Sequence, residues 1–547
     1  MSSLARYTVP AIAIAIFLAL ATLDLDKPGY YYDEVIFVPV SLRVLGDCAV
    51  DAAVTRQIGC FPLMQTLGYV GAVKAWLHAP VFALFGTSVW AVRLPSILLG
   101  AATLLVLWSF VRRELGGAWA ALLLALLCVD PVLIGHARLD WGPHMLAAFL
   151  RVLSLVALWR WLQTGRTHWL AVACAALVVG FFDKINFVWV IGAWLGALAV
   201  VAGREAWRRL RDGRPWQPAL AGTTLAIIAI GAATLVRQAV QLDILGNAGT
   251  FSWSDHAAKV WTLFAATFSG TSVLGWVFGS DPPVTIAFNV LALVQCLTAV
   301  VLLALWRPWT PARRLLAFLT VASVLLVLAI AATRQVGGTH HLVTVWPLPA
   351  LHLVTLLAIA AQHLDGTTRL QGRGLRTVVA TTGAVVVGAV LAWNIAMDVR
   401  YVDTFENDQD YRPGFDPAIG KLSRRLEGLG VDRVISVDWG LHQQLVTLAG
   451  PAHAARYREW SWRLIDAPDL DRPDLRRAVD EHVAGKRVAF VLHPPATTVF
   501  AGARERLDQL LARDKPCEVK EESFVNAAGK PLYQIVVADY RNCAPKT

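Results

Sequence analysis

Charged residues are scarce in this sequence. Only 16% of its 547 residues are Asp, Glu, Lys or Arg, against about 25% in soluble domains, and 56% are hydrophobic. This composition excludes an ordinary soluble protein, and it indicates many membrane spans rather than one anchor. A cleavable signal pattern is also missing. The first apolar segment, 8–24, is long enough to span a membrane, but no small-residue cleavage site follows it.

The net charge of +10 does not indicate nucleic-acid binding, and we expect no nucleic-acid partner. The basic residues stand in short clusters between apolar runs, which is typical of cytoplasmic loops under the positive-inside rule. Such clusters begin near residues 112, 166, 204, 307 and 369, and they alternate with loops poorer in Lys and Arg. We therefore expect a cytoplasmic N-terminus and an outer-face C-terminal segment, in a multi-pass protein of the inner (plasma) membrane.

The apolar runs predict a polytopic α-helical membrane protein with about 11 transmembrane helices, because each span needs about 20 residues. The predicted spans are 8–24, 88–110, 118–135, 143–161, 168–182, 186–202, 218–236, 284–305, 313–332, 342–361 and 376–397. The apolar stretch 61–86 contains Lys74, His78 and Pro80. We interpret it as helices that lie along the outer membrane surface.

The composition changes after the last predicted span. Helical and strand patterns alternate there, and the end of the chain reads as two strands around an Asn/Gly turn. We expect a transmembrane module at 1–397, whose first outer loop, 25–87, carries juxtamembrane helices, and a soluble outer-face α/β domain at 398–547.

The seven cysteines divide by location. Three lie in predicted spans, where cysteine acts as a small apolar residue: Cys128, Cys174 and Cys296. The other four form two pairs on the predicted outer face, Cys48 with Cys60 and Cys517 with Cys543. An oxidising compartment favours disulfides for both pairs, with free thiols as the alternative.

Several ionisable residues gather at the outer ends of predicted spans. Such residues are costly at membrane depth, so their presence there is a hypothesis of function, and we expect them to converge on one outer-facing cavity. They are Asp33, Glu34, Lys74, Arg138, Asp140, Asp183, Lys184, His340 and His341.

This mixture of charges suits the transfer of a sugar from a lipid phosphate. The acceptor hydroxyl or amine needs a base, which a carboxylate supplies. The phosphate leaves without a general acid, but its growing charge needs Lys, Arg or a metal. A hydrolytic glycosidase would need two carboxylates on either side of the bond. The tyrosines beside Asp33, Tyr32 among them, suit a sugar face or a prenyl chain.

Three features together resemble the GT-C superfamily of polyprenyl-phosphate-sugar glycosyltransferases. An Asp-Glu pair follows the first span, "RLPS" lies in the run into the second, and an Arg-x-Asp motif, Arg138 to Asp140, follows the third. The nearest branch is that of the protein O-mannosyltransferases and aminoarabinose transferases. The resemblance extends well over the first seven spans, loosely over the later ones and hardly over the last 150 residues.

The resemblance implies roles for individual residues. Asp33 matches the first-loop acid, which is the base or the acceptor-positioning group. Glu34 and Asp140 match the second acid of the pair and the acid after the third span. Lys74 lies near the place of a cation for the lipid phosphate, although "CFPLMQ" replaces the family's His/Lys-Pro-Pro signature. The His340–His341 pair resembles a late outer-loop motif.

Plainer interpretations stay open for each residue. Asp33 and Glu34 fit solvated loop acids, and Lys74 fits a side chain that extends to lipid headgroups. Asp140 with Arg138, and Asp183 with Lys184, fit structural ion pairs, and we favour that interpretation for the second pair, with a substrate contact by Lys184 second. His340 and His341 fit ordinary interface residues. Two histidines near carboxylates leave a divalent cation, Mg²⁺ or Mn²⁺, as an open cofactor prediction.

The sequence thus predicts an inverting glycosyltransferase that works on the outer face. Its donor is a polyprenyl-phosphate-linked hexose or pentose, and its acceptor is a protein, a lipid or a cell-envelope glycan. Asp33 acts as base, Glu34 and Asp140 position acceptor or metal, and Lys74 and Arg138 face the donor phosphate. The alternative is a transporter or a flippase of lipid-linked sugars, although the charges gather at one face and no internal repeat is present.

Overall fold

The computed structural model describes residues 5–65, 68–241, 252–279, 286–305, 309–333, 338–366, 372–407, 411–465 and 470–541. The chain forms two compact units. The first, here the helical unit, contains Met1–Leu23, Ser96–Trp276 and Ser280–Val402. The second, here the sheet unit, contains Asp24–Pro95, Val277–Gly279 and Asp403–Thr547. Helices α5, α13 and α18 each begin in one unit and end in the other.

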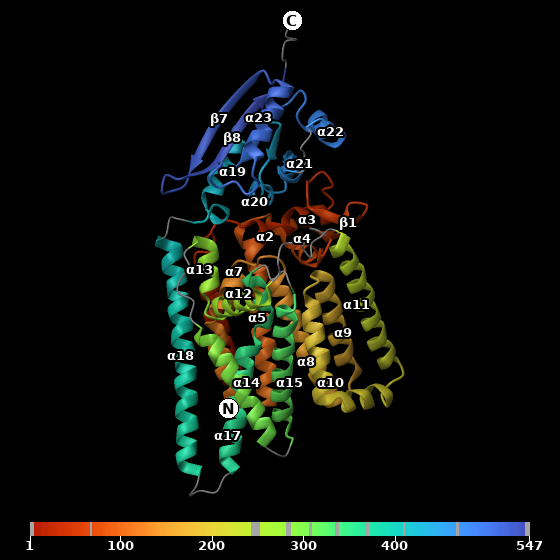
Figure 1. Cartoon of the computed structure of the whole chain (residues 1–547), viewed down its shortest axis with the longest axis vertical. Coiled ribbons are helices and arrows are strands. Elements are labelled where there is room, and N and C mark those ends of the chain that lie inside the picture. The colour runs from red at the N-terminus through yellow and green to blue at the C-terminus, as the bar shows by residue number, and fades with distance from the viewer. Residues whose placement is uncertain are drawn as a thin grey trace. The chain divides into compact units, whose positions relative to one another are not determined.

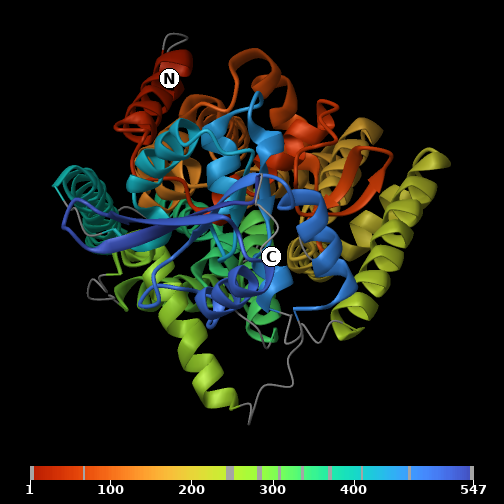
Figure 2. The ribbon, with the colours of Figure 1, turned by 90° about the horizontal axis from the view of Figure 1, so that it is seen from above.

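The helical unit is a bundle in which α8, α9, α10, α15 and α17 pack side by side (Figure 1). Its elements are α1 (Ala5–Thr22), α5 (Val89–Glu114), α6 (Gly117–Cys128), α7 (Pro131–Arg138), α8 (His144–Thr164), α9 (Thr167–Asp183), α10 (Phe187–Arg211), α11 (Trp216–Gln241), α12 (Trp253–Phe268), α13 (Thr271–Phe278), α14 (Ala287–Leu305), α15 (Pro311–Ala331), α16 (Thr339–Leu342), η1 (Val343–Val345), α17 (Leu348–Gly366) and α18 (Gly372–Asn407). Figure 2 shows α11 and α18 at opposite edges of this unit.

Eight helices of the described chain are long and apolar enough to cross a membrane, and ten do so if each of two bent helix pairs is one span. The first bent pair, α6 with α7, matches the predicted span 118–135. The second, α12 with α13, turns by 100° and was not predicted from the sequence. The predicted spans 8–24 and 168–182 correspond to shorter apolar helices. A multi-pass helical membrane protein is therefore confirmed.

Local chemistry explains the sharp bend between α6 and α7. Asp130 caps α7, since its carboxylate accepts a hydrogen bond from the backbone N–H of Val132, and Pro131 takes the first helical position. At the other bend, Gly270 has φ +77° and a side chain there would meet Pro131. The two bends therefore lie against each other.

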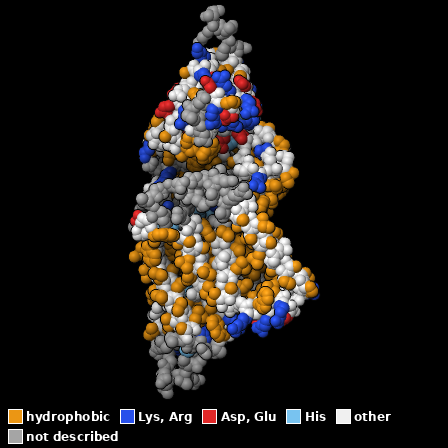
Figure 3. All heavy atoms as spheres, turned by 45° about the vertical axis from the view of Figure 1, so that its right-hand side comes forward, with side chains coloured by type: hydrophobic (Ala, Val, Ile, Leu, Met, Phe, Trp, Pro, Cys, Tyr) orange, Lys and Arg blue, Asp and Glu red, His pale blue; other side chains and the backbone are white. Residues whose placement is uncertain are grey.

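The flank of the helical unit has the surface that lipid requires. Figure 3 shows hydrophobic side chains over this flank and a group of Lys and Arg at one end. Exposed apolar residues belong to α11, α14 and α18, which are the least enclosed of the candidate spans: Leu225, Ile227, Ile230, Leu293, Val294, Leu297, Val378, Val385 and Ile395. The end of α10 carries basic residues, as positive-inside loops do.

The sheet unit combines the first loop with the C-terminal segment. The loop contributes α2 (Tyr32–Val35), α3 (Phe37–Val44), a small sheet of β1 (Val54–Ile58), β2 (Phe61–Gln65) and β3 (Val70–Gly71), and α4 (Val73–Phe85). The C-terminal segment contributes η2 (Pro413–Phe415), α19 (Ala418–Gly428), β4 (Arg433–Ser436), α20 (His442–Ala449), η3 (Ala454–Arg456), β5 (Tyr457–Glu459), α21 (Ser461–Ile465), α22 (Pro473–His482), β6 (Arg487–Leu492), α23 (Ala503–Asp514), β7 (Glu518–Val525) and β8 (Pro531–Asp539).

The five C-terminal strands form one sheet in the order β5-β4-β6-β8-β7. The first three are parallel, and β8 pairs antiparallel with both β6 and β7. Helices cover the apolar faces of the sheet, so its central strands are buried on both sides. The predicted α/β character of this segment, including the terminal hairpin, is confirmed.

The first loop packs on the C-terminal segment within one core. Leu42 and Val50 of the loop share a buried cluster with Ile419 and Leu445. The stretch 61–86 differs from the prediction, because among its described residues only Val73–Phe85 is helical, whereas Phe61–Gln65 and Val70–Gly71 are strands. Gly59, at φ +59°, lies in the tight β1–β2 turn, which is what makes a hairpin there instead of a helix.

The cysteine predictions are largely confirmed. Cys48 and Cys60 form a disulfide with a Cα–Cα distance of 5.5 Å. The three cysteines of the predicted spans, Cys128, Cys174 and Cys296, are free thiols. The other predicted pair includes Cys543, which lies outside the described residues.

Candidate functional site

Asp33 lies in the middle of α2, a single helical turn at the start of the sheet unit. Its side chain is half-buried, whereas its neighbours Tyr32 and Glu34 are buried. The turn is held by Tyr31, whose ring stacks on Phe415 with centroids 4.4 Å apart. Asp33 is therefore presented from a fixed element, as a general base requires.

Glu34 forms a buried ion pair with Arg93 of α5. Arg93 Nε donates to Glu34 Oε1 at 2.6 Å and its second terminal nitrogen donates to Oε2 at 3.0 Å. Both side chains are at most 2% exposed. Arg93 also donates to the backbone carbonyls of Leu25 and Pro28 at the start of the loop. Glu34 thus fixes α2 and the loop, and we assign it a positioning role.

Tyr32 lies inside an acidic and aromatic group of the sheet unit. The centre of its ring lies 4.5 Å from that of Trp439, a residue of the loop that follows β4. Burial raises the pKa of Tyr32 well above its usual range, and the carboxylates of Glu459 and Asp33 raise it further. Burial and Asp33 likewise raise the pKa of Tyr69. Tyr32 is therefore a neutral hydroxyl beside Asp33.

Lys74 lies on α4 and is almost completely buried, so it does not extend to headgroups. Its ammonium group lies 4.2 Å from the ring centre of Phe37, which is a cation–π contact. His78, one turn later, contacts the backbone carbonyl of Lys74. These contacts hold α4 against α3.

Asp140 and Arg138 are both buried in the helical unit. Asp140 accepts hydrogen bonds from Ser96 at 2.9 Å and from the backbone N–H of Met145 at 3.1 Å, at the start of α8. Arg138 donates to the carbonyl of Leu23 at 2.5 Å, just past the end of α1. Each side chain therefore stabilises a helix end.

His340 and His341 belong to a row of four imidazole rings in the helical unit, here the imidazole row. The ring centres are 6.0 Å apart for His136 and His144, 5.9 Å for His144 and His340, and 4.3 Å for His340 and His341. Three tryptophans surround the row: Trp141 beside His136, Trp276 beside Trp141, and Trp189 beside His341.

Lys184 lies beside this row. It ends α9, and its ammonium group lies close to Gly142, between His136 and His144 in the chain. Lys184 interacts electrostatically with His144, His340 and His341. The preceding residue, Asp183, is fully buried. Three of the predicted residues, Lys184, His340 and His341, are thus brought together.

Sequence reasoning missed Arg93, His136 and His144. Arg93 lies in the "RLPS" motif inside the predicted span 88–110, and a charge within a span usually has a partner. His136 and His144 lie in the same short stretch as Asp140. Arg151, which is buried within α8, donates to the carbonyl of Val343, which immediately follows α16.

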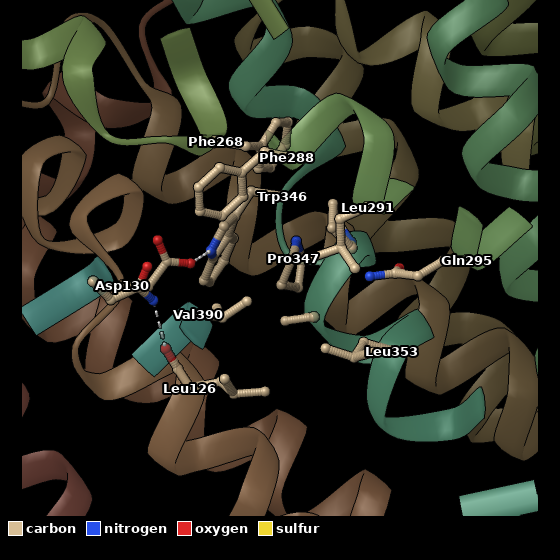
Figure 4. Close-up of a pocket in the computed structure, with 13 residues that line it drawn as sticks. Leu126, Asp130, Phe268, Phe288, Leu291, Gln295, Trp346, Pro347, Leu353 and Val390 are labelled. Carbon is tan, nitrogen blue, oxygen red and sulfur yellow. Dashed lines mark hydrogen bonds between the residues drawn. The ribbon is translucent and has the colours of Figure 1, made fainter. Parts of the chain in front are cut away.

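Two cavities of the helical unit lie away from these residues. One has about 60 Å³ and is lined by Asp130, Trp346 and apolar side chains; Figure 4 shows the Trp346 indole pointing at the Asp130 carboxylate, to which it donates at 2.8 Å. The other has about 360 Å³ and is an apolar groove between α12, α14, α15 and α17. The first is too small for a sugar, and the second has few polar groups.

The predicted divalent metal stays a prediction, because no ligand set for it is found among the described residues. Within the described ranges, no three His, Cys, Asp or Glu side chains are arranged to hold a metal ion. The possible Mg²⁺ or Mn²⁺ cofactor therefore has no assigned ligands.

The chain is similar to known glycosyltransferases. Residues 70–232 match the family model for dolichyl-phosphate-mannose-protein mannosyltransferase. The whole chain is similar to ArnT from Cupriavidus metallidurans, in its apo state (15% identity, TM-score 0.55, 96% of this chain and 97% of that chain) and bound to undecaprenyl phosphate (14%, 0.55, the same coverage). It is also similar to the oligosaccharyltransferase of Archaeoglobus fulgidus in complex with Zn and sulfate (12% identity, TM-score 0.51, 96% of this chain and 72% of that chain). No curated protein matches the chain by sequence.

These similarities confirm the resemblance predicted from the sequence: the fold is that of the GT-C superfamily.

Proposed function

We propose that this chain, which has the GT-C fold, is a glycosyltransferase that moves a sugar from a polyprenyl phosphate to an acceptor on the outer face of the membrane. The observation that supports this proposal most is the fixed presentation of Asp33 on α2, next to the buried Glu34–Arg93 ion pair. The complex of ArnT with undecaprenyl phosphate supports a lipid-phosphate donor.

Asp33 is the proposed base. Its half-buried carboxylate accepts the proton of the acceptor hydroxyl or amine as that group attacks the anomeric carbon. The phosphate leaves with the bonding electron pair, so no general acid is needed. Direct displacement inverts the anomeric configuration. The sugar, hexose or pentose, and the acceptor, a protein, a lipid or a glycan, belong to the proposal at the level of class only.

The other predicted residues keep proposed roles that fit their contacts. Glu34 is a positioning residue that holds α2. Asp140 fixes the start of α8, next to the imidazole row. Lys184, His340 and His341 are proposed substrate-binding residues of the helical unit. Arg138 and Lys74 hold helices in the structure, and we still propose them as contacts of the donor phosphate.

The topology proposed from the basic loops places the N-terminus in the cytoplasm and the sheet unit outside, in a plasma or inner membrane. The Cys48–Cys60 disulfide of the sheet unit supports this, because disulfides persist in oxidising compartments.

The proposal is tested by transfer from radiolabelled polyprenyl-phosphate sugars to a membrane extract by the purified full-length protein. Asp33→Asn keeps the size of the side chain and removes the base, so transfer should fall at least a hundredfold. The matched control is Asp26→Asn, an exposed acid of the same loop, which should keep transfer within about twofold. Equal activity of wild type and Asp33→Asn, with the protein folded, would refute the assignment of the base.

A further inference from the structure

The C-terminal sheet has the topology of a ligand-binding sheet at one of its edges. β4 lies between β5 and β6, and the three strands are parallel. Helix α20, which connects β4 to β5, packs in the core on one face of the sheet, and α22, which connects β5 to β6, packs in the core on the other. In such sheets ligands bind outside the carboxyl ends of the strands, where the connections change faces. The carboxyl ends of β4 and β5 are therefore a candidate binding site.

Trp439 lies in the loop that follows β4 and is half-buried. The carboxylate of Asp438 fixes this loop, because it accepts hydrogen bonds from the backbone N–H groups of Trp439 at 2.8 Å and Phe500 at 3.1 Å. The Trp439 ring packs on the first loop, with its centre 4.5 Å from that of Tyr32 and 6.4 Å from that of Tyr31. The end of β4 thus carries an aromatic face next to α2.

Glu459 is the last residue of β5, and its carboxylate has a fixed orientation. One carboxylate oxygen accepts a hydrogen bond from Ser461 at 3.0 Å, and the other accepts one from Gln443 of α20 at 3.0 Å. Both donors are uncharged, and each carboxylate oxygen keeps a further lone pair. Glu459 is half-buried and interacts electrostatically with the Tyr32 hydroxyl. It can therefore accept a hydrogen bond from a ligand that lies beside Tyr32.

The Tyr32 hydroxyl is a buried polar group that the fold does not use. Its side chain is 5% exposed, and its hydroxyl has no hydrogen bond to another described residue. Buried polar groups nearly always have a partner. The hydroxyl also interacts electrostatically with Asp33 and Tyr69 of the first loop. It therefore lies near two carboxylates, those of Asp33 and Glu459, where α2 meets α20 (Figure 1).

These groups suit a saccharide. Carboxylates accept hydrogen bonds from sugar hydroxyls, and a neutral tyrosine hydroxyl both donates and accepts. The apolar face of a sugar ring packs on a flat aromatic side chain such as Trp439, which is partly exposed. Small-molecule sites combine such apolar surface with a few polar groups that fix the orientation of the ligand. A cationic peptide is the alternative ligand for the two acids, and it serves as a comparison in the test.

We propose that Trp439, Glu459 and Tyr32 form a saccharide-binding site at the carboxyl ends of β4 and β5. A saccharide in this site lies next to Asp33, the proposed base, and is therefore the acceptor of the transfer reaction. The assignment as acceptor rests on the proposed function, whereas the binding of a saccharide does not. The site thus selects a glycan from the three acceptor classes, in place of a protein or a lipid without sugar.

The test measures binding without a sugar donor, so it is independent of transfer. The fluorescently labelled full-length protein in detergent is applied to an array of immobilised neutral glycans of hexoses, pentoses and N-acetylhexosamines. Immobilised trilysine and a phospholipid are the comparisons. Wild type should bind at least one class of glycan more tightly than either comparison. Preference for trilysine, or no binding to any glycan, would overturn the proposal.

Substitutions then locate the glycan. Tyr32→Phe removes only the hydroxyl and should weaken glycan binding about fivefold, as the loss of one hydrogen bond does. Trp439→Ala removes the aromatic face and should weaken binding about tenfold. The matched controls are Tyr533→Phe and Trp462→Ala, which should not change glycan binding. Tyr533 is also buried, but its hydroxyl donates to the Pro413 carbonyl at 3.1 Å, and Trp462 is a 49% exposed tryptophan of the same unit.

Thermal unfolding separates a ligand contact from a structural role. Tyr32→Phe should leave the unfolding midpoint within about 2 °C of wild type, because the lost hydroxyl has no partner among the described residues, whereas Tyr533→Phe should lower it further. Unchanged glycan binding by Tyr32→Phe, with a midpoint that falls as far as that of Tyr533→Phe, would overturn the site.

A variant that does not fold still leaves the proposal testable. Glu459→Gln keeps the shape of the side chain and removes its charge, so it replaces Trp439→Ala if that variant does not fold. It should weaken glycan binding about fivefold, and unchanged binding by both Glu459→Gln and Tyr32→Phe would overturn the site. Glycan binding by wild type without transfer from any donor would instead refute the proposed function and leave this site standing.

Discussion

Loss of the Glu34–Arg93 ion pair should destabilise the sheet unit strongly. Arg93→Met keeps most of the stem of the side chain but removes every hydrogen bond of the guanidinium group. Glu34 would then be a carboxylate that is 1% exposed without its counter-ion. The carbonyls of Leu25 and Pro28 would also lose a donor.

The expected magnitude follows from the burial of the pair. Removal of one partner of a buried ion pair costs about 3–5 kcal/mol, because the other charge stays buried without compensation. For a unit of 150–250 residues, 1 kcal/mol corresponds to about 2–4 °C in the unfolding midpoint. Arg93→Met should therefore lower the midpoint by about 6–20 °C.

The assay is thermal unfolding of the purified full-length protein in detergent. Glu34→Gln keeps the shape of the side chain and should cost less than Arg93→Met. The double variant should be more stable than Arg93→Met alone, because it no longer buries a lone charge. The matched control is Glu521→Gln. Glu521 also lies 2.6 Å from an arginine, Arg504, but is 53% exposed, so its loss should cost less than about 1 kcal/mol.

Two results would refute this reasoning. The first is a midpoint for Arg93→Met within about 2 °C of wild type. The second is equal destabilisation by Glu34→Gln and Glu521→Gln, because burial would then make no difference to the pair.

Three further predictions concern stability. Burial lowers the pKa of His493 in the folded protein. The stability that the neutral imidazole contributes is therefore fully present above the pKa of the unfolded state, about 6.5, and is lost as the pH falls below that value. His493→Gln should flatten the fall in the unfolding midpoint between about pH 7.5 and 5.5. Replacement of Cys48 and Cys60 by Ser should cost about 2–3 kcal/mol, and a reductant should then no longer lower the midpoint. Gly270→Ala should reduce the yield of folded protein, because the new Cβ would lie 2.6 Å from Pro131 at a φ of +77°; Gly222→Ala, which meets nothing within 4 Å, is its control.

The fold was largely predictable from the sequence because lipid imposes long apolar runs. The C-terminal α/β segment followed from the same kind of local pattern. The hairpin of β1 and β2 was missed, because β2 belongs to the apolar stretch 61–86, which resembles a surface helix. The bend between α12 and α13 was missed because two short helices that meet at a sharp angle give no single long run.

The candidate site was only partly predictable. The role of Asp33 stays a prediction. The partner of Glu34 is 59 positions away and follows from three-dimensional packing alone. The contact of Arg138 with the carbonyl just past the end of α1 was not predictable, because a neighbouring acid in the chain says nothing about where a long side chain reaches. His136 and His144 acquire meaning only beside α16, which lies almost 200 residues later.

The most direct test of the account follows two labels in one reaction. A polyprenyl-phosphate sugar labelled with ³H in the sugar and ³²P in the phosphate is given to the full-length protein in vesicles with an acceptor extract. The account predicts that ³H moves to the acceptor while ³²P stays with the lipid as polyprenyl phosphate, and that Asp33→Asn abolishes this separation. Movement of both labels together across the bilayer, without separation, would contradict it and would indicate a flippase.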